Sequence, residues 1–528
     1  MPLRGRGGAQ VQYPQSVVLP VRPIGGLWAQ DPDQETPVEV SPDMLNCTVR
    51  RGQLRKRMGY EQYPPAAAAI GTSVIGLYST QDVEAAQFLF AVHPTGAVMY
   101  NAGSSVWTAL TGPALTGGAD KLFVFANSQN SIVFSQGVDP VMRMPFTGTT
   151  YAALDAGAVA AQYLTRAAGR LLLGHTYESS VSKPFRIRFC VRDTHTDWTG
   201  IGSGFRDCSE FPHHLKGLKK LGAGVAVYYD KAIELASQSG MAAAPLVYDV
   251  RIADIGLYAP ATLQGRNDLH MFVGNDNVYT FNGVQLDPIG EVIRDALFYS
   301  LNTIKLDRCF AEIISSTQEY LIFLCTSANP TPNVVWVYHW GRKIWYPWSV
   351  SGPSCSATHY LETYASIDEL VGTIAEQNWL LSIGSLRGSV QSLLTGHTDG
   401  KVYRWGEQFL GDNGTTIPCR WTSKDFTGKD VGTVGHKITL KAIRIAYEDT
   451  GVRCVLKFYF STDGGATWTD SQSVVLPAKS TGDRTAVVWH QVTGDRIRFK
   501  FENNTATETF RIQAFYLQFE PRSSPIYP

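Results

Sequence analysis

The stretch that decides the fold is Asn275-Asp-Asn-Val-Tyr-Thr-Phe-Asn-Gly283, in which turn residues pass into a short strand that closes on a glycine. Similar stretches occur at Gly96-Ala-Val-Met-Tyr-Asn-Ala-Gly103 and at Asp399-Gly-Lys-Val-Tyr-Arg-Trp-Gly406. In each, Asn, Asp or Gly supplies the tight turn, and a strand containing Val and Tyr follows. A repeated strand–turn–strand unit is typical of the blades of a β-propeller. We therefore predict a propeller, with about five to seven blades.

Short apolar runs of strand length surround this repeat. Such runs suit inner strands that are covered on both faces, as in stacked radial sheets. The clearest ones are Phe88–Val92, Leu122–Ala126, Ser131–Phe134, Gly224–Tyr229, His270–Val273, Glu319–Cys325 and Val334–Tyr338. Helical periodicity is scarce, and its best example is the segment from Ile289 to Asn302, where we expect a helix.

The pattern changes near Gly411-Asp-Asn-Gly414, because the later strands are longer and alternate between apolar and polar residues. The alternating strands are expected at Lys437–Ala446, Val452–Phe460, Asp495–Phe501 and Phe510–Phe519. One apolar and one polar face per strand is typical of a half-exposed antiparallel sandwich. The predicted fold is therefore all-β. An N-terminal arm and first strands (1–62) close the propeller, a propeller with inserted loops covers 63–411, and a C-terminal β-sandwich covers 412–528.

Composition and charge narrow the class of protein. The chain has 528 residues, of which 44% are apolar, so it can bury a substantial core. Lys and Arg number 46, as do Asp and Glu, and this balance argues against a dedicated nucleic-acid binder. No apolar run approaches the ~18 residues that cross a membrane, and the start lacks the apolar core of a secretory signal. We expect synthesis in the cytoplasm and no membrane-spanning segment.

Eight cysteines are scattered along the chain without a CxxC pair or a zinc-like Cys/His spacing. They are Cys47, Cys190, Cys208, Cys309, Cys325, Cys355, Cys419 and Cys454. Several lie in apolar runs, so we expect buried free thiols in a chain that folds in a reducing compartment. The sequence predicts no metal site and no cofactor-binding residue.

Ser461-Thr-Asp-Gly-Gly-Ala-Thr-Trp468 matches the Asp-box pattern S-x-D-x-G-x-T-W at every fixed position. We expect the Asp463 carboxylate to accept N–H bonds of the turn, Gly465 to reverse the chain, and Trp468 to pack back on the hairpin. The box is a structural device, and it is weak support for a sialidase.

No catalytic residue is predicted. A glycosidase needs two converging carboxylates, or in sialidases a Tyr–Glu pair with an arginine cluster. The acids of one loop-rich stretch, Asp193, Asp197, Asp207 and Glu210, are expected to be solvated loop carboxylates. The histidines His175, His213 and His214 have no metal-binding context, and Gly200–Gly204 is expected to be a flexible loop.

A basic cluster lies near the N-terminus, at Arg50-Arg51 and Arg55-Lys-Arg57. It could contact nucleic acid. We favour the alternative that it is the edge of a hairpin, with solvated charges that discourage edge pairing.

Three further stretches resemble the β-propeller tail-nozzle, or tail-hub, proteins of short-tailed bacteriophages. The first is Pro23-Ile-Gly-Gly-Leu-Trp-Ala-Gln-Asp31, followed by Asn46-Cys-Thr-Val-Arg-Arg-Gly-Gln-Leu-Arg-Lys-Arg-Met-Gly-Tyr60. The second is the expected hairpin from Leu215 to Leu235, and the third runs from Phe272 through Gly283 to Ile289–Arg294. None of these motifs is catalytic, and the C-terminal sandwich has no counterpart in the resemblance.

The resemblance implies a non-enzymatic virion protein of the phage tail, made in the host bacterial cytoplasm. It would form a ring of six copies below the portal and the head-to-tail adaptor proteins. Tail fibre or tailspike proteins would be further partners, and double-stranded DNA would pass the ring during ejection without sequence-specific binding.

Two other functions stay open. The chain could be a receptor- or glycan-binding module at the tail tip, with Trp421, Trp468 or Trp489 as the exposed aromatic side chains that such a site needs. Alternating strands more often bury these residues. A sialidase-like glycoside hydrolase is the less favoured alternative.

Overall fold

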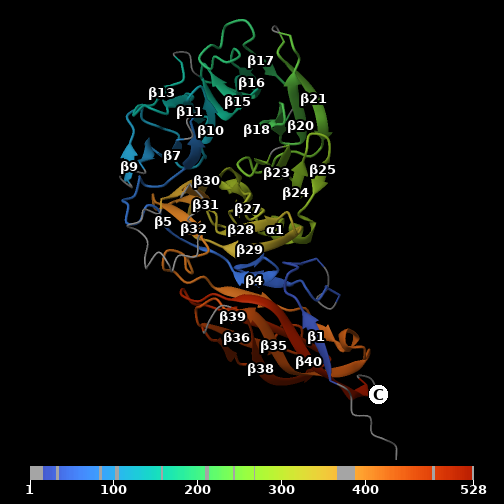
Figure 1. Cartoon of the computed structure of the whole chain (residues 1–528). Coiled ribbons are helices and arrows are strands. Elements are labelled where there is room, and N and C mark those ends of the chain that lie inside the picture. Colours follow the sequence, from blue (N-terminus) through green and yellow to red (C-terminus); the bar gives the residue numbers. More distant parts are fainter. Residues whose placement is uncertain are drawn as a thin grey trace, which may run out of the picture. The chain divides into compact units, whose positions relative to one another are not determined.

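The computed structural model describes residues 16–30, 35–82, 86–101, 106–155, 159–208, 213–241, 244–266, 268–364, 387–478 and 482–525 (Figure 1). The chain divides into two compact units. One unit contains Met58–Lys343 and Trp348–Asn413. The other contains Met1–Arg57, Ile344–Pro347 and Gly414–Pro528.

Seven four-stranded antiparallel sheets lie within the described residues, built almost entirely from strands of the first unit. The first three sheets are each built from four consecutive strands. They comprise β6 (Gly76–Gln81), β7 (Gln87–His93), β8 (Gly96–Asn101) and β9 (Val106–Ala109); β10 (Val124–Ser128), β11 (Ser131–Ser135), β12 (Met142–Pro145) and β13 (Ala152–Ala153); and β14 (Ala160–Ala167), β15 (Arg170–Glu178), β16 (Val181–Phe189) and β17 (Gly204–Asp207).

The next three sheets follow the same order. They comprise β18 (Leu215–Leu221), β19 (Gly224–Tyr229), β20 (Ala232–Gln238) and β21 (Leu246–Ala253); β22 (Gln264–Arg266), β23 (Leu269–Val273), β24 (Val278–Phe281) and β25 (Leu286–Pro288); and β26 (Phe310–Ile314), β27 (Glu319–Leu324), β28 (Val334–His339) and β29 (Ile344–Ser349).

The seventh sheet joins strands from distant parts of the chain. Its first three strands are β30 (Pro353–Tyr364), β31 (Arg387–His397) and β32 (Val402–Gly406), and its fourth is β5 (Gly59–Gln62). The first strands of neighbouring sheets contact one another in sequence, and β30 contacts β6, so the ring is closed (Figure 1). The predicted β-propeller is confirmed, and it has seven blades.

The three copies of the sequence repeat occupy equivalent places in this ring. Each supplies the turn that follows the second strand of a blade and the third strand after it, namely β8, β24 and β32. Gly400 at one of these turns has φ +78°, a left-handed conformation that favours glycine. The repeat therefore marks the same hairpin in three blades.

The pairing of β5 with β32 brings together two segments about 340 residues apart, which is far beyond local contact. Tyr60 of β5 pairs with Trp405 and is buried against it, with 4.9 Å between ring centroids. Gly59 lies against the backbone of Gly411, where an added Cβ would come 2.2 Å from the carbonyl oxygen. Only glycine therefore fits this contact without a shift of the backbone.

The second unit contains two six-stranded antiparallel sheets within the described residues. One comprises β1 (Val17–Val21), β3 (Cys47–Arg50), β4 (Gln53–Lys56), β40 (Arg511–Pro525), β35 (His436–Glu448) and β38 (Asp483–Gly494). The other comprises β2 (Asp43–Leu45), β33 (Cys419–Thr422), β34 (Phe426–Thr427), β39 (Arg496–Asn503), β36 (Cys454–Ser461) and β37 (Gln472–Leu476).

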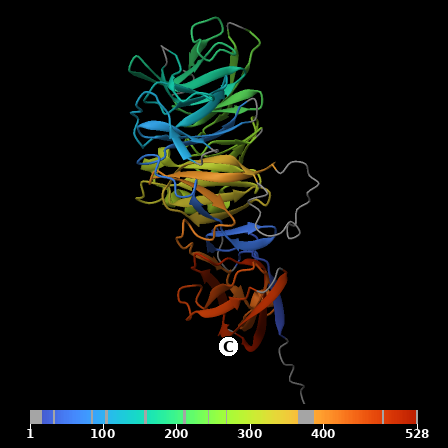
Figure 2. The ribbon, with the colours of Figure 1, turned by 60° about the vertical axis from the view of Figure 1, so that its left-hand side comes forward.

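Aromatic side chains of these two sheets meet in a core. Trp421 of β33 stacks on Phe515 of β40 with 5.5 Å between centroids, and Phe499 of β39 meets Phe515 edge-on at 5.4 Å. Four N-terminal strands belong to these sheets, and the blue strands β1 and β4 lie beside the red C-terminal strands (Figures 1 and 2). The second unit is therefore assembled from both ends of the chain.

Helices are few among the described residues. The predicted helix is confirmed as the 3-10 turn η1 (Glu291–Ile293) and the helix α1 (Arg294–Ser300), with Leu297 buried. Two more 3-10 segments, η2 (Thr303–Arg308) and η5 (Gly428–Val431), follow later in the chain. No helix of the described residues has the length and apolar character needed to cross a membrane.

The closing contact yields a first prediction. Gly59→Ala should lower the free energy of unfolding of the propeller by about 1–3 kcal/mol, because the new methyl group overlaps the Gly411 carbonyl. Thermal unfolding followed by calorimetry measures this change. Gly148→Ala is the matched control, since its added Cβ meets only ordinary contacts beyond 3.4 Å. Equal melting temperatures for the two variants would contradict the closing role of β5.

Candidate functional site: the axial cavity of the propeller

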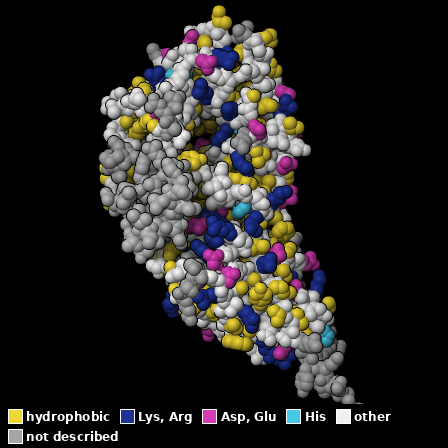
Figure 3. All heavy atoms as spheres, viewed as in Figure 1, with side chains coloured by type: hydrophobic (Ala, Val, Ile, Leu, Met, Phe, Trp, Pro, Cys, Tyr) yellow, Lys and Arg dark blue, Asp and Glu magenta, His cyan; other side chains and the backbone are white. Residues whose placement is uncertain are grey.

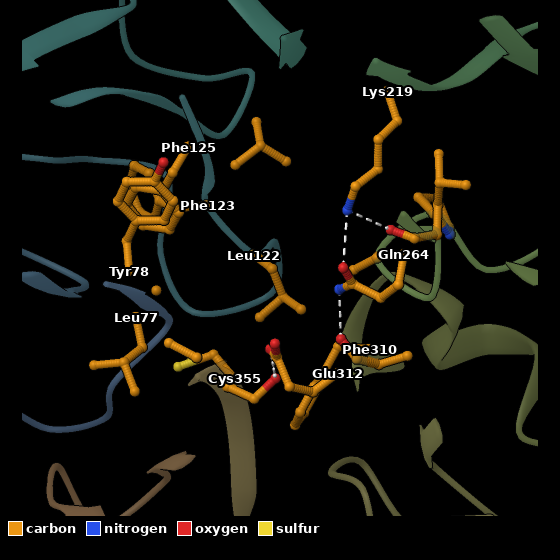
Figure 4. Close-up of a pocket in the computed structure, with 18 of the residues that line it drawn as sticks. Leu77, Tyr78, Leu122, Phe123, Phe125, Lys219, Gln264, Phe310, Glu312 and Cys355 are labelled. Atoms are coloured by element: carbon orange, nitrogen blue, oxygen red, sulfur yellow. Dashed lines mark hydrogen bonds between the residues drawn. The ribbon is translucent and has the colours of Figure 1, made fainter. Parts of the chain in front are cut away.

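The first strands of the blades enclose a cavity of about 370 Å³ on the axis of the ring (Figure 4). Each of the seven blades contributes lining residues from its first strand or from the segment just before it. Because these segments are far apart in sequence, the cavity exists only when the ring is closed.

Blades one and two supply an apolar wall. Tyr78 of β6 meets Phe123 and Phe125, which lie just before and within β10, and Leu77 belongs to another apolar cluster with Leu122 (Figure 4). Tyr78 stacks on Phe125 with 5.1 Å between centroids and an interplanar angle of 10°. Blade three continues this wall with Tyr163 and Leu164.

Blades four to seven supply a polar wall made of one hydrogen-bonded chain (Figure 4). Lys219 Nζ of β18 donates to Gln264 Oε1 of β22 at 2.8 Å and to the Leu263 carbonyl at 3.1 Å. Gln264 Nε2 then donates to the Ala311 carbonyl of β26 at 2.5 Å. The next residue, Glu312, accepts from hydroxyl groups of β30.

Glu312 forms the last link of this chain. Its two carboxylate oxygens accept hydrogen bonds from Ser356 Oγ at 3.0 Å and from Thr358 Oγ1 at 2.9 Å. Hydrogen bonds therefore link four consecutive blades, and in blade six the link passes along the backbone from Ala311 to Glu312. Since each partner is supplied by the neighbouring blade, the chain fixes how the inner strands lie against one another.

The cavity shifts the protonation of its two charged groups. Burial lowers the pKa of Lys219 to about 8, and the charge of Glu312 acts in the opposite direction. Burial raises the pKa of the Glu312 carboxyl, although the hydroxyl groups of Thr358 and Ser356 and the nearby Lys219 partly offset this. Each group thus favours the charged form of the other.

This geometry sets what the cavity can do. Its volume is that of a small-molecule site and corresponds to roughly a dozen water molecules. A DNA duplex, whose major groove alone is about 12 Å wide, is far too large for it. The polar side chains are satisfied by each other and by backbone carbonyls, which indicates a role in holding the blades together.

Asp193 and Asp197 lie in one turn, and Asp207 ends β17. Asp193 adopts φ 57° beside Arg192, Asp197 accepts the N–H groups of Thr199 and Gly200, and Asp207 pairs with Arg186 at 2.6 Å. The turn N–H groups lower the pKa of Asp197. Glu210 lies outside the described residues. The described acids therefore have separate local partners, as loop carboxylates do.

The three histidines also have local roles. His175 stacks on Tyr177, and its Nε2 lies 3.1 Å from Ser182 Oγ. Burial lowers the pKa of His175 to about 4. His214 meets Phe185 edge-on at 5.4 Å, and His213 precedes it in the same segment. Within the described residues, no three His, Cys, Asp or Glu side chains gather as a metal site.

The prediction that the basic cluster is solvated is wrong for three of its residues. Arg50 and Arg51 end a hairpin, as expected, but Arg55, Lys56 and Arg57 are buried. Lys56 Nζ donates to Asn503 Oδ1 at 3.2 Å and to the carbonyls of Thr505 and Glu508. β4 is also paired on both sides, by β3 and β40, so it is no edge. These cations stabilise the joining of the N- and C-terminal strands.

The Asp box has the expected local structure. Asp463 accepts hydrogen bonds from the N–H of Thr467 at 3.0 Å and from the hydroxyls of Thr467 and Ser461. These bonds lower the pKa of Asp463 well below its ordinary value. Gly465 has φ 90°, and the half-buried Trp468 lies beneath Lys500 Nζ at 4.7 Å. The motif closes a hairpin turn between β36 and β37.

The three tryptophans considered for glycan binding differ in exposure. Trp421 is buried in the core between the two sheets of the second unit, and Trp468 is half-buried. Trp489 of β38 is 73% exposed. It is the single one of the three that offers an open ring face.

The residues of the polar wall were not singled out by the sequence. Lys219 lies in a strand with two other lysines, and Glu312 lies in an ordinary apolar strand. No spacing within one segment identifies them, since their partners come from other blades. Only the ring closure brings them together.

Comparisons with known proteins found similarity only among solved structures. No family model matches it, and no curated protein does. Among solved structures it is similar to YCF48 from Cyanidioschyzon merolae, with 8% identity over 50% of this chain and 95% of that chain, at a TM-score of 0.28. It is also similar to the extracellular domain of the one component system BT4673 from B. thetaiotaomicron. That match has 9% identity over 87% of this chain and 63% of that chain, at a TM-score of 0.39.

Lys219 yields the second prediction. Its pKa is about 8 in the folded chain against an ordinary 10.5, so the unfolded chain binds more protons between these values. From pH 8 to 10.5, the stability of the wild type should therefore rise relative to that of Lys219→Met by about 2 kcal/mol. Urea unfolding at pH 7, 9 and 10.5 measures the difference. The exposed Lys231→Met should show no such trend, and a flat difference for Lys219→Met would contradict the buried charge.

Proposed function

We propose that the chain is a structural virion protein of a short-tailed phage tail, a nozzle or hub subunit without enzymatic activity. It assembles with copies of itself into a ring, proposed as a hexamer, below the portal and adaptor proteins. The ring forms part of the DNA-ejection channel and carries contacts to tail fibre or tailspike proteins. The second unit is proposed as a β-sandwich appended to the propeller.

The proposal rests on where one stretch that resembles the tail-nozzle proteins, Asn46–Tyr60, lies in the fold. Its residues Gly59 and Tyr60 occupy β5, at the closing contact of the propeller. Its Asn46 is buried at the junction of β2 and β3. The resemblance therefore rests on residues with demanding structural roles. This supports an architecture shared with the tail-nozzle proteins.

The small axial cavity supports a channel that lies between subunits. A bore of this volume cannot pass a duplex, so DNA must travel along a path that several copies enclose. The DNA must also leave the channel, and a wall of mixed charge binds phosphates less tightly than a basic wall. Lys and Arg side chains are interspersed with Asp and Glu on the face shown in Figure 3, in keeping with the formal net charge of zero.

Exposed apolar side chains support an assembly. Tyr299 of α1 is 97% exposed and Ile304 of η2 is 87% exposed, both on the segment between blades five and six. The outer strand β21 exposes Val247 and Val250 along an unpaired edge of eight residues. Strand edges that expose apolar side chains favour association unless something covers them, although β21 also exposes the ion pair of Asp249 with Arg251. A neighbouring subunit would cover them in a ring.

The third prediction tests the assembly. The purified full chain should form rings with an axial channel between subunits, visible by negative-stain microscopy and by mass measurement in solution. Tyr299→Ser together with Ile304→Ser should weaken the ring, because it removes two exposed apolar contacts, whereas Gly148→Ala should leave it intact. Labelling of intact particles with an antibody against the chain should place it in the tail. A chain that stays monomeric and is absent from virions would overturn the proposal.

The alternative of a receptor- or glycan-binding module rests on Trp489. An exposed aromatic ring on a rigid strand can stack against a sugar, and Trp489 lies on β38 among the exposed positions of that strand. A sialidase-like hydrolase has no comparable support from the Asp box, which serves a turn. We therefore keep binding as the second candidate function.

The fourth prediction distinguishes a glycan-binding module from a glycoside hydrolase. If the module binds host glycan, Trp489→Ala should reduce binding of the chain to intact host cells at least tenfold. Val284→Ala is the matched control, because Val284 is also 73% exposed but lies in the propeller. Unchanged binding by Trp489→Ala would remove the aromatic site. New reducing ends after incubation with host polysaccharide would instead favour the hydrolase.

A further inference from the structure

A corner in the second unit brings two strands of different sheets together. β2 pairs with β33 in one sheet, and β3 belongs to the other sheet, so the chain changes sheet between Leu45 and Cys47. Asn46 makes this change with φ 55°, a left-handed conformation that asparagine tolerates. Its Nδ2 donates to the Pro418 carbonyl at 2.6 Å, which holds the corner against β33.

The corner places two thiols in contact. Cys47 follows Asn46 and Cys419 follows Pro418, and their sulfur atoms lie 3.0 Å apart. Both side chains are buried, and Cys47 Sγ also lies 3.3 Å from the Arg420 carbonyl. An S–S bond is about 2.05 Å long, so a shift of about 1 Å separates this contact from a covalent link.

We propose that Cys47 and Cys419 form a disulfide when the chain meets a low-molecular-weight disulfide. The thiolate of one cysteine attacks the small disulfide, forms a mixed disulfide and releases one small thiol. The thiolate of the other cysteine then attacks the protein sulfur of the mixed disulfide and releases the second small thiol. Overall, two protein thiols and one small disulfide give one protein disulfide and two small thiols, so protons and electrons balance.

Burial controls when this exchange happens. Burial raises the pKa of the Cys47 thiol, so little Cys47 thiolate is present in the folded unit. Exchange therefore occurs during folding or on transient opening of the corner. The same burial shields the finished bond from reductants.

The bond would have an unusual topology. Residues 47 and 419 lie before and after the propeller in sequence, so the closed loop contains all seven blades, although both cysteines belong to the second unit. A cross-link over so long a loop restricts the unfolded chain strongly. The oxidised chain would keep its two end segments tethered even after β5 leaves β32. The inference does not depend on the tail function.

The other cysteines provide controls. The backbone N–H of Cys325 donates to Cys309 Sγ at 3.5 Å in the propeller, and the Cys325 side chain together with burial raises the pKa of Cys309. A bond between them would enclose a short loop. Cys190 instead accepts the N–H of Leu171 at 3.1 Å and contacts no other thiol in the described structure.

The fifth prediction follows from loop size. The reduced full chain is incubated with oxidised glutathione, both in native buffer and during refolding from urea, and free thiols are then blocked with an alkylating agent. On a non-reducing denaturing gel, the cross-linked chain should migrate faster, because a long loop makes it more compact. The fast band should vanish on reduction, be absent in Cys47→Ser and Cys419→Ser, and persist in Cys190→Ser and Cys325→Ser.

Peptide mapping of the oxidised wild type makes the outcome independent of how the variants fold. A linked peptide pair containing residues 47 and 419, and a higher melting temperature for the oxidised than for the reduced chain, support the proposal. Both peptides found only as alkylated thiols after the refolding arm would overturn it. So would a fast band that survives in Cys419→Ser.

Discussion

The structure depends on one constraint: the last blade of a closed ring needs a strand from the other end of the chain. Without β5, the edge of β32 would be open, and the aromatic cluster of Tyr60 with Trp405 would lose its buried contact. β5 covers this edge as the fourth strand of the blade, while the contact of β30 with β6 closes the ring of inner strands. β5 completes the seventh blade as its outer strand, and the Gly59 and Tyr60 contacts hold it there.

The two walls of the cavity join the inner strands by different kinds of contact. In blades one to three, apolar and aromatic contacts such as Tyr78 on Phe125 join the inner strands. Such van der Waals contacts depend little on the relative orientation of the groups. In blades four to seven, the chain from Lys219 to Glu312 joins them through hydrogen bonds of fixed geometry. A buried polar chain is stabilising only when every member has a partner, and here each blade supplies the partner of the next. The polar side chains of this wall are therefore already engaged with one another and with backbone carbonyls.

The limits of sequence reasoning follow from distance along the chain. The propeller was predictable because each blade hairpin is local, so the turn and strand around Val278 and Tyr279 leave a readable repeat. The buried basic cluster was not, because Lys56 finds its partners at Asn503, Thr505 and Glu508, and a run of cations looks solvated when those partners are unknown. The polar wall was hidden for the same reason. The Asp box was understood from sequence, since the bonds from Thr467 to Asp463 span only four residues.

Asn46 shows how a single side chain can set where a long chain enters and leaves a domain. Its Oδ1 accepts from Arg57 Nε at 2.9 Å, and its Nδ2 donates to the Pro418 carbonyl at 2.6 Å. Arg57 is the last residue of the second unit before the propeller begins, and Pro418 lies just after the propeller ends. One buried amide therefore forms hydrogen bonds at both ends of the segment that contains all seven blades. An amide can donate and accept at once, which aspartate cannot do at neutral pH and leucine cannot do at all. The left-handed backbone at this position further narrows the choice, so the corner needs both the amide and the tolerance for positive φ that asparagine combines.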